Sequence, residues 1–121
     1  MTTTVLIVDD SRAMRDMLRH SLTAAGFRVI QAEDGVNGME VLESEKPDVI
    51  VTDINMPRMD GFGFIEAVRK GDVCRATPVL VLTTEVDPEK KNRARSAGAT
   101  GWIVKPFDPV KLVDAIRRVA A

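Results

Sequence analysis

The sequence predicts an α/β fold, a doubly wound parallel sheet of five strands with five helices. Two observations support this prediction. Short runs of β-branched and other apolar residues alternate five times with helical patterns along the 121 residues. The connections between successive runs are also too long for hairpins, so we expect each strand to be joined to the next by a helical crossover.

Five runs are predicted to form the strands. In chain order they are Val5–Val8, the weaker Phe27–Ile30, Val49–Val51, Val79–Leu82 and Trp102–Val104. Their length and β-branching are typical of strands, and apolarity is continuous rather than alternating. Continuous apolarity predicts burial on both faces of the sheet.

The helices are predicted from apolar spacing. Met14, Met17, Leu18 and Leu22 follow the i, i+3, i+4, i+8 spacing of one helix face. Two further packing faces are expected in later helices, one from Phe62, Phe64, Ile65 and Val68 and the other from Leu112, Val113, Ile116 and Val119.

Capping residues mark the predicted helix ends. Asp87 and Asp108 each precede a proline, as an N-cap precedes the first turn, and Gly26 and Gly98 stand where helices should end. The helix over residues 88–97 has only two apolar residues, both alanines. We expect it to be weakly held, although a plain solvated surface helix fits the pattern equally well.

Composition narrows the class of protein. Lys and Arg number 17 against 18 Asp and Glu, a net charge of −1 that argues against direct nucleic-acid binding. Cys74 is the single cysteine, which suits a reducing, cytoplasmic setting, and the apolar run Val5–Val8 is too short for a signal peptide or a membrane span. Residues 1–121 are therefore expected to form one monomeric domain, with no second domain.

Polar residues follow four of the apolar runs. Asp9 and Asp10 follow the first, Asp53 the third, Thr83 and Thr84 the fourth, and Lys105-Pro106 the fifth. The carboxyl ends of parallel strands meet at one edge of a sheet, where ligands bind.

Each residue alone has a plainer role. Asp10 or Ser11 could cap the first helix, and Asp53 could accept loop hydrogen bonds. Thr83 could simply end a strand, and Lys105 could be solvated. Because all of these residues are expected at one edge of the sheet, a shared functional site is favoured over separate, unrelated roles.

The chemistry of this edge indicates Mg²⁺ and phosphoryl transfer. Three clustered carboxylates repel one another, and an oxygen-only ligand set without His or Cys suits a hard cation, so Mg²⁺ is favoured over zinc. A lysine and a threonine can bind the oxygens of a phosphoryl group. No glycine-rich nucleotide loop is present in the sequence. A carboxylate that accepts a phosphoryl group is therefore favoured over direct use of ATP.

Four motifs together carry a family resemblance. They are "VLIVDDSRAMR", "DVIVTDINMPRMDGF", "PVLVLTTE" and "GWIVKPF". In this order and spacing, the chain closely resembles the receiver domains of two-component response regulators, and among them the single-domain chemotaxis regulators. The resemblance covers the whole chain. It implies a flavodoxin-like sheet with strand order 2-1-3-4-5.

The resemblance also implies roles for the site residues. Asp53 would accept a phosphoryl group from the phosphohistidine of a histidine kinase. Asp9, Asp10, Asp53 and the main-chain carbonyl of Asn55 would hold Mg²⁺. Thr83 and Lys105 would bind the phosphoryl oxygens. The Met56-Pro57 turn and Gly61 would shape the loop after Asp53, and the Lys105–Pro106 bond would be cis.

The resemblance also implies a conformational switch and residues that control the lifetime of the phosphorylated state. Thr83, with Thr84 beside it, would move toward the phosphoryl group, and Trp102 would turn inward behind it. Trp102 stands where Tyr or Phe is more usual, and Thr84 where a smaller residue is common, so a plain core tryptophan remains an alternative. Asn55 and Glu85 would set access of water to the phosphorylated aspartate.

The output surface is expected on the fourth helix, the fifth strand and the fifth helix. Its predicted residues are Lys90, Lys91, Arg93, Trp102, Lys111 and Arg117. Basic residues there suit an acidic partner segment. The resemblance implies that this partner is the flagellar motor switch protein and that a chemotaxis histidine kinase is the phosphodonor.

Three other functions stay open. A phosphate sink or phosphorelay intermediate would keep the chemistry without binding a motor. An aspartyl-phosphate phosphatase usually carries a second acid two residues after the nucleophile, where this chain has Asn55. A flavodoxin-like protein would bind FMN, whose phosphate the acidic edge repels.

Overall fold

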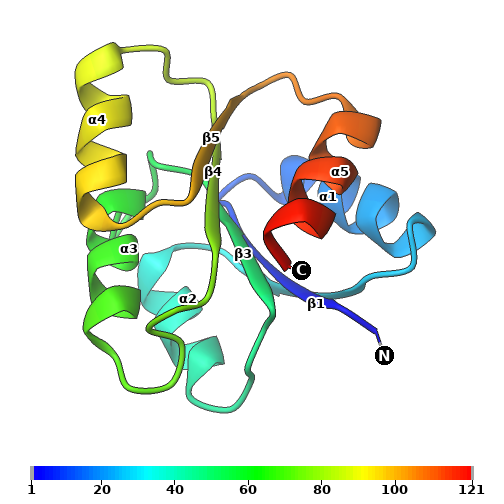
Figure 1. Ribbon diagram of the computed structural model, residues 1–121, viewed down its shortest axis with the longest axis horizontal. Helices are drawn as coiled ribbons and strands as arrows, with labels where there is room; N and C mark the ends of the chain where they lie inside the picture. The colour runs from blue at the N-terminus through cyan, green and yellow to red at the C-terminus, as the bar shows by residue number, and fades with distance from the viewer. Residues whose placement is uncertain (1, 121) are drawn as a thin grey trace.

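The computed structural model describes residues 2–120 and confirms the predicted α/β fold. Within these residues, five strands alternate with five helices (Figure 1). The elements are β1 (Thr4–Val8), α1 (Arg12–Ala24), β2 (Arg28–Ala32), α2 (Gly35–Leu42), β3 (Val49–Thr52), α3 (Gly61–Lys70), β4 (Val79–Thr83), α4 (Pro88–Ala97), β5 (Gly101–Val104) and α5 (Pro109–Ala120).

The five strands form one parallel sheet in the order β2-β1-β3-β4-β5. This is the order that the family resemblance implies. Helices α1 and α5 cover one face of the sheet, and α2, α3 and α4 cover the other (Figure 1). The sheet is therefore doubly wound. From β1 the chain first adds β2 on one side and then returns to add β3, β4 and β5 on the other, so the strand order reverses between β1 and β3.

Two hydrophobic cores lie on the two faces, because successive strand side chains point in opposite directions. In β3, Ile50 joins the core beneath α2, α3 and α4, whereas Val49 and Val51 join the core beneath α1 and α5. Phe64 of α3 is the largest fully buried side chain of the first core. Leu18 and Leu22 of α1, with Leu112 and Ile116 of α5, close the second.

The prediction that every strand is buried on both faces is wrong for β2 and β5. Strands β1, β3 and β4 are buried almost throughout, but Val29 and Ile30 of β2 and Trp102 and Ile103 of β5 are only half-buried. Val104 is 41% exposed. The strand order explains the difference, since β2 and β5 are edge strands with a single neighbour.

The predicted helix caps are confirmed. Asp87 accepts a hydrogen bond from the Glu89 N–H (3.0 Å), and Asp108 accepts one from the Val110 N–H (2.9 Å). Ser11, not Asp10, caps α1. Gly98 ends α4 with φ 115°, in the left-handed region that favours glycine.

Helix α4 has the shallow buried face that its sequence predicts. Ala94 is its only buried residue. Among residues 2–120, no helix combines the length and the apolarity that crossing a membrane requires.

Candidate functional site

Asp9, Asp10 and Asp53 meet at the carboxyl ends of β1 and β3. One carboxylate oxygen from each lies within 4.8 Å of the others. The Asp53 N–H donates to the Val8 carbonyl (2.9 Å), and the Asp9 N–H donates to the Ala32 carbonyl (3.1 Å). Both aspartates therefore continue the hydrogen-bond ladders of the sheet, which fixes where their side chains start.

The three carboxylates differ in exposure. Asp9 is buried (2% exposed), Asp53 is half-buried and Asp10 is exposed. The Ser11 N–H donates to Asp9 Oδ1 (2.9 Å), and the Ile54 N–H donates to Asp53 Oδ1 (2.6 Å). Each of these two carboxylates thus has one oxygen held by the backbone and the other turned toward the cluster.

Lys105 joins these carboxylates from the end of β5. Its Nζ donates to Asp53 Oδ2 (2.8 Å) and to Asp9 Oδ2 (2.9 Å), and its side chain is only 10% exposed. Its backbone N–H donates to the Thr83 carbonyl (2.8 Å). The Lys105–Pro106 bond is cis, as the family resemblance implies. Lys105 is therefore a member of the site and not a solvated loop lysine.

Burial and charge shift the pKa values of this cluster. Burial raises the pKa of Asp9, although hydrogen bonds from Lys105 and from the Ser11 N–H oppose the shift. Burial alone would lower the pKa of Lys105, but hydrogen bonds to Asp53 and Asp9, and their charges, raise it overall. One ammonium thus faces three carboxylates, and the site carries uncompensated negative charge.

This donor set fits Mg²⁺. The ligand atoms that Asp9, Asp10 and Asp53 offer are all carboxylate oxygens, and their mutual repulsion favours a divalent cation. These three residues would hold the ion. A bound Mg²⁺ would supply positive charge against the oxygens of an incoming phosphoryl group.

The loop after β3 carries the residues predicted to complete the site. Asn55 is exposed, Met56 packs partly against the first core, and Pro57 is exposed. The Gly61 N–H donates to the Ile54 carbonyl (2.8 Å). A Cβ at Gly61 would overlap the Asp53 carbonyl oxygen and lie 2.8 Å from Ile54 Cα. Glycine is therefore needed where α3 begins against the site.

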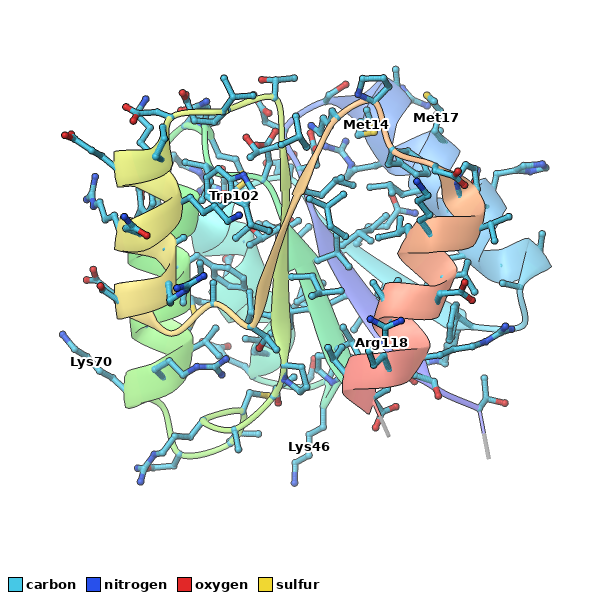
Figure 2. The ribbon with its side chains drawn as sticks, turned by 45° about the horizontal axis from the view of Figure 1, so that its top comes forward. Met14, Met17, Lys46, Lys70, Trp102 and Arg118 are labelled. Carbon is cyan, nitrogen blue, oxygen red and sulfur yellow. The ribbon has the colours of Figure 1, made fainter. Side chains whose placement is uncertain are left out.

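The predicted switch residues lie on β4, β5 and the loop between β4 and α4. Thr83 is buried at the end of β4, and its Oγ1 accepts a hydrogen bond from the Glu85 N–H (3.3 Å). Thr84 is exposed. Trp102 is half-buried on the face of the sheet that α4 covers, and it pairs in register with Val81 (Figure 2).

The predicted output residues do not share one surface. Lys91 and Trp102 line a groove between α4 and β5, and Trp102 and Lys111 line a second groove between β5 and α5. Two arginines of the predicted set lie outside these grooves. Arg93 lies over the Phe62 ring, 4.1 Å from its centroid, on the side of α4 that faces α3. Arg117 faces α1, where it donates to the Ala25 carbonyl (3.1 Å).

Three residues that lie beside the grooves or the carboxylate cluster, Arg95, Arg58 and Asp34, are not predicted from the sequence. Arg95 lines the groove with Lys91, one helical turn away, but the weak amphipathicity of α4 gives no sign of which face is exposed. Arg58 and Asp34 form an ion pair across 24 residues, and no local pattern predicts it. Lys90, one of the predicted output residues, forms an ion pair with Glu85: its Nζ lies 3.0 Å from Glu85 Oε2.

Together, a doubly wound parallel sheet and a carboxylate cluster joined by a lysine at its carboxyl edge define the class of domain. Comparisons with known proteins agree. The response regulator receiver domain family matches residues 5–117. The chain therefore belongs to the receiver domains of two-component response regulators.

Within this family, the chain is similar to chemotaxis proteins over nearly its whole length. It is 38% identical over 116 residues to a probable chemotaxis protein CheY of Rhizobium etli, which covers 95% of this chain and 90% of that protein. The structure of the chemotaxis response regulator CheY4 of Vibrio cholerae matches with a TM-score of 0.92 and 45% identity, over 98% of this chain and 99% of that one.

Longer response regulators match as well. The response regulator MprA of Mycobacterium ulcerans is 38% identical over 118 residues, which are 97% of this chain but 50% of that protein. The chain thus spans about half the length of this relative. Receiver domains of this family thus occur both in longer response regulators and in proteins of about this length.

Proposed function

We propose that this protein is a phosphorylation-dependent signalling switch in which Asp53 accepts a phosphoryl group from a histidine kinase. One observation carries the proposal. Asp53 Oδ2 lies 2.8 Å from the Lys105 ammonium and belongs to the carboxylate cluster with Asp9 and Asp10. A half-buried carboxylate beside a fixed cation and a candidate Mg²⁺ site suits attack on a phosphoryl group.

The transfer would proceed by in-line displacement. One Asp53 carboxylate oxygen attacks phosphorus, an O–P bond forms, and the P–N bond to the kinase imidazole breaks. The electron pair of that bond leaves with the imidazole. Lys105 would then bind a phosphoryl oxygen, and Thr83 Oγ1 would turn from the Glu85 N–H toward another. Asn55, two residues after Asp53, and Glu85, whose N–H donates to Thr83 Oγ1, would set access of water to the acyl phosphate.

The signal would pass to a partner through the grooves beside β5. Lys91, Arg95 and Lys111 border these grooves with Trp102, and their positive charge suits an acidic segment of a partner protein. By similarity to the CheY proteins, we propose the flagellar motor switch as that partner. A cytoplasmic, monomeric protein fits this role, and the free, buried Cys74 suits a reducing compartment.

Phosphorylation with a small donor tests the acceptor. The protein is incubated with Mg²⁺ and phosphoramidate, and its intact mass is recorded. We expect one added phosphoryl group, lost in Asp53→Asn and without Mg²⁺, and retained in Asp72→Asn, which alters a fully exposed carboxylate (96%). A wild-type protein that gains no group under any condition would refute the proposal.

Binding of a motor-switch peptide tests the partner. We expect phosphorylation to raise the affinity for this peptide, and Lys91→Glu with Arg95→Glu to abolish the gain. Arg117→Gln serves as the control because this arginine faces α1. Rapid loss of phosphate without peptide binding would instead indicate a phosphate sink.

A further inference from the structure

The loop after β3 is fastened to the start of α2 by an ion pair. Arg58 Nε donates to Asp34 Oδ2 (2.7 Å), and Arg58 Nη2 donates to Asp34 Oδ1 (3.0 Å). Two parallel hydrogen bonds between a guanidinium and a carboxylate fix both the distance and the relative orientation of the groups. This loop is the one that contains Asn55 and follows Asp53.

The Asp34 side chain is itself held firmly. It is buried (3% exposed), and its Oδ1 also accepts the Asn37 N–H (2.8 Å) as the N-cap of α2. The Glu33 carboxylate lies 3.8 Å from Arg58 Nη2 and adds negative charge beside the guanidinium. Arg58 is therefore anchored to a helix end that packs against the sheet.

The backbones of the two segments are in contact as well. The Gly35 N–H donates to the Met59 carbonyl (3.1 Å), and a Cβ at Gly35 would lie 2.7 Å from that oxygen. Arg58 has φ 64°, the left-handed conformation that non-glycine residues rarely adopt. A strained residue of this kind persists where its surroundings hold it in place.

The segment that holds Arg58 also touches the other half of the carboxylate cluster. The Ala32 carbonyl, at the end of β2, accepts the Asp9 N–H (3.1 Å). Ala32 thus contacts the end of β1, where Asp9 lies, and Gly35 contacts the loop that follows Asp53. The β1–β3 ladder already fixes Asp9 relative to Asp53, so what this segment holds in place is the loop beyond Asp53, which carries Asn55.

We infer that Arg58 and Asp34 are positioning residues for the cation site: their ion pair fixes the loop after β3 relative to Asp9 and Asp10. The inference rests on the metal site of the proposed function. It predicts that cation affinity depends on a pair of residues that offer no ligand to the cation. It also predicts that the loop opens more often when the pair is broken, even without metal.

The test compares Arg58→Gln with Arg75→Gln. Both changes remove a partly exposed guanidinium that pairs with a carboxylate, but Arg75 and its partner Asp72 lie in the loop after α3, away from the site. Mg²⁺ affinity is measured by isothermal titration calorimetry, and amide hydrogen exchange is measured in metal-free protein. Thermal unfolding of each variant is recorded alongside.

For Arg58→Gln we expect Mg²⁺ to bind on the order of tenfold more weakly. The Gly35 and Gly61 amides, which bond to Met59 and Ile54, should exchange faster. Arg58→Lys should recover part of the affinity, because it keeps the charge and loses the paired hydrogen bonds. Arg75→Gln should match the wild type.

Asp34→Asn is the second variant, since asparagine still caps a helix. It should weaken Mg²⁺ binding as Arg58→Gln does, and the double variant should show no further loss, because both changes break one interaction. Mg²⁺ affinity and exchange rates equal to those of Arg75→Gln in both single variants would overturn the inference.

The two proposals fail separately. A wild-type protein that accepts no phosphoryl group would refute the function of Asp53. The exchange of the Gly35 and Gly61 amides is measured without metal or donor, so it decides the role of the ion pair in either case.

Discussion

Lys105 Nζ donates a 2.8 Å hydrogen bond to Asp53 Oδ2, although the two residues are 52 positions apart in the sequence. The same ammonium binds Asp9 Oδ2 at 2.9 Å. Lys105 therefore occupies the position from which a cation can both offset part of the negative charge of the cluster at rest and bind the oxygens of a group transferred to Asp53.

Replacing Lys105 by methionine should destabilise the metal-free protein. Asp9 would remain buried without its ammonium partner, and loss of one partner of a buried pair costs about 3 kcal/mol. The pKa of Asp9, already raised by burial, should rise further, so the loss should be smaller at about pH 4 than at about pH 7. Urea unfolding at both pH values measures the effect. Equal stability of Lys105→Met and wild type would contradict it.

Gly61→Ala should be much more harmful than Gly63→Ala. A Cβ at Gly61 would overlap the Asp53 carbonyl oxygen, whereas a Cβ at Gly63 would lie 3.3 Å from the flexible Met59 side chain and at an ordinary 3.5 Å from Asp60 Oδ1. We expect Gly61→Ala to cost about 2–3 kcal/mol of unfolding free energy and to slow phosphorylation. Gly63→Ala, in the same helix, should change both little. Similar unfolding midpoints for the two variants would show that the site tolerates the added methyl group.

Asp34 should make the protein more sensitive to acid. The Arg58 guanidinium holds the pKa of Asp34 below its ordinary value of 3.8, against the opposing effect of burial. A carboxyl group with a lowered folded pKa stabilises the protein above its unfolded pKa, and this stability is lost as pH falls through the folded value.

Asp34→Asn should therefore cost about 1 kcal/mol at neutral pH, a modest value because Arg58 is half exposed. The difference from wild type should shrink between about pH 5 and about pH 2. Unfolding free energies across this range give the result. A difference that stays constant with pH would exclude the ion pair as its cause.

Helix α4 should open more often than the other helices. Only Ala94 is buried in it, whereas α1 buries Leu18 and Leu22. Amides of α4 should exchange faster than those of α1, and Asp87→Ala, which removes the N-cap, should accelerate them further by about fivefold. Hydrogen exchange with residue resolution tests this. Equal protection in α4 and α1 would mean that α4 is held by contacts other than its buried face.

The sequence was sufficient for the strands, the helices and the core of the site. The reason is physical: strand ends of a parallel sheet meet at one edge, so Asp9, Asp53 and Lys105 could be brought together from their positions after apolar runs. The strand order came only from resemblance to the family. Continuous apolarity in β5 predicted burial on both faces of the sheet. Trp102 and Ile103 do pack on opposite faces, but both stay only half-buried because β5 has a neighbouring strand on one side alone.

Long-range polar contacts could not be predicted in the same way. Arg58 adopts φ 64°, where a sequence would suggest glycine or asparagine, because Asp34 holds its side chain from 24 residues away. The faces of Arg93 and Arg117 depend on contacts with the rings of Phe62 and Phe27 on other elements. No local spacing contains that information.

The central claim is that Asp53 forms an acyl phosphate. It is tested most directly by treating the phosphorylated protein with borohydride, which reduces an acyl phosphate to the alcohol, and sequencing the peptides by mass spectrometry. We predict homoserine at position 53, dependent on Mg²⁺ and on phosphoramidate, with Asp9 and Asp10 unchanged. Homoserine at another aspartate, or at none while the protein still carries a phosphoryl group, would contradict the assignment of Asp53 as the acceptor.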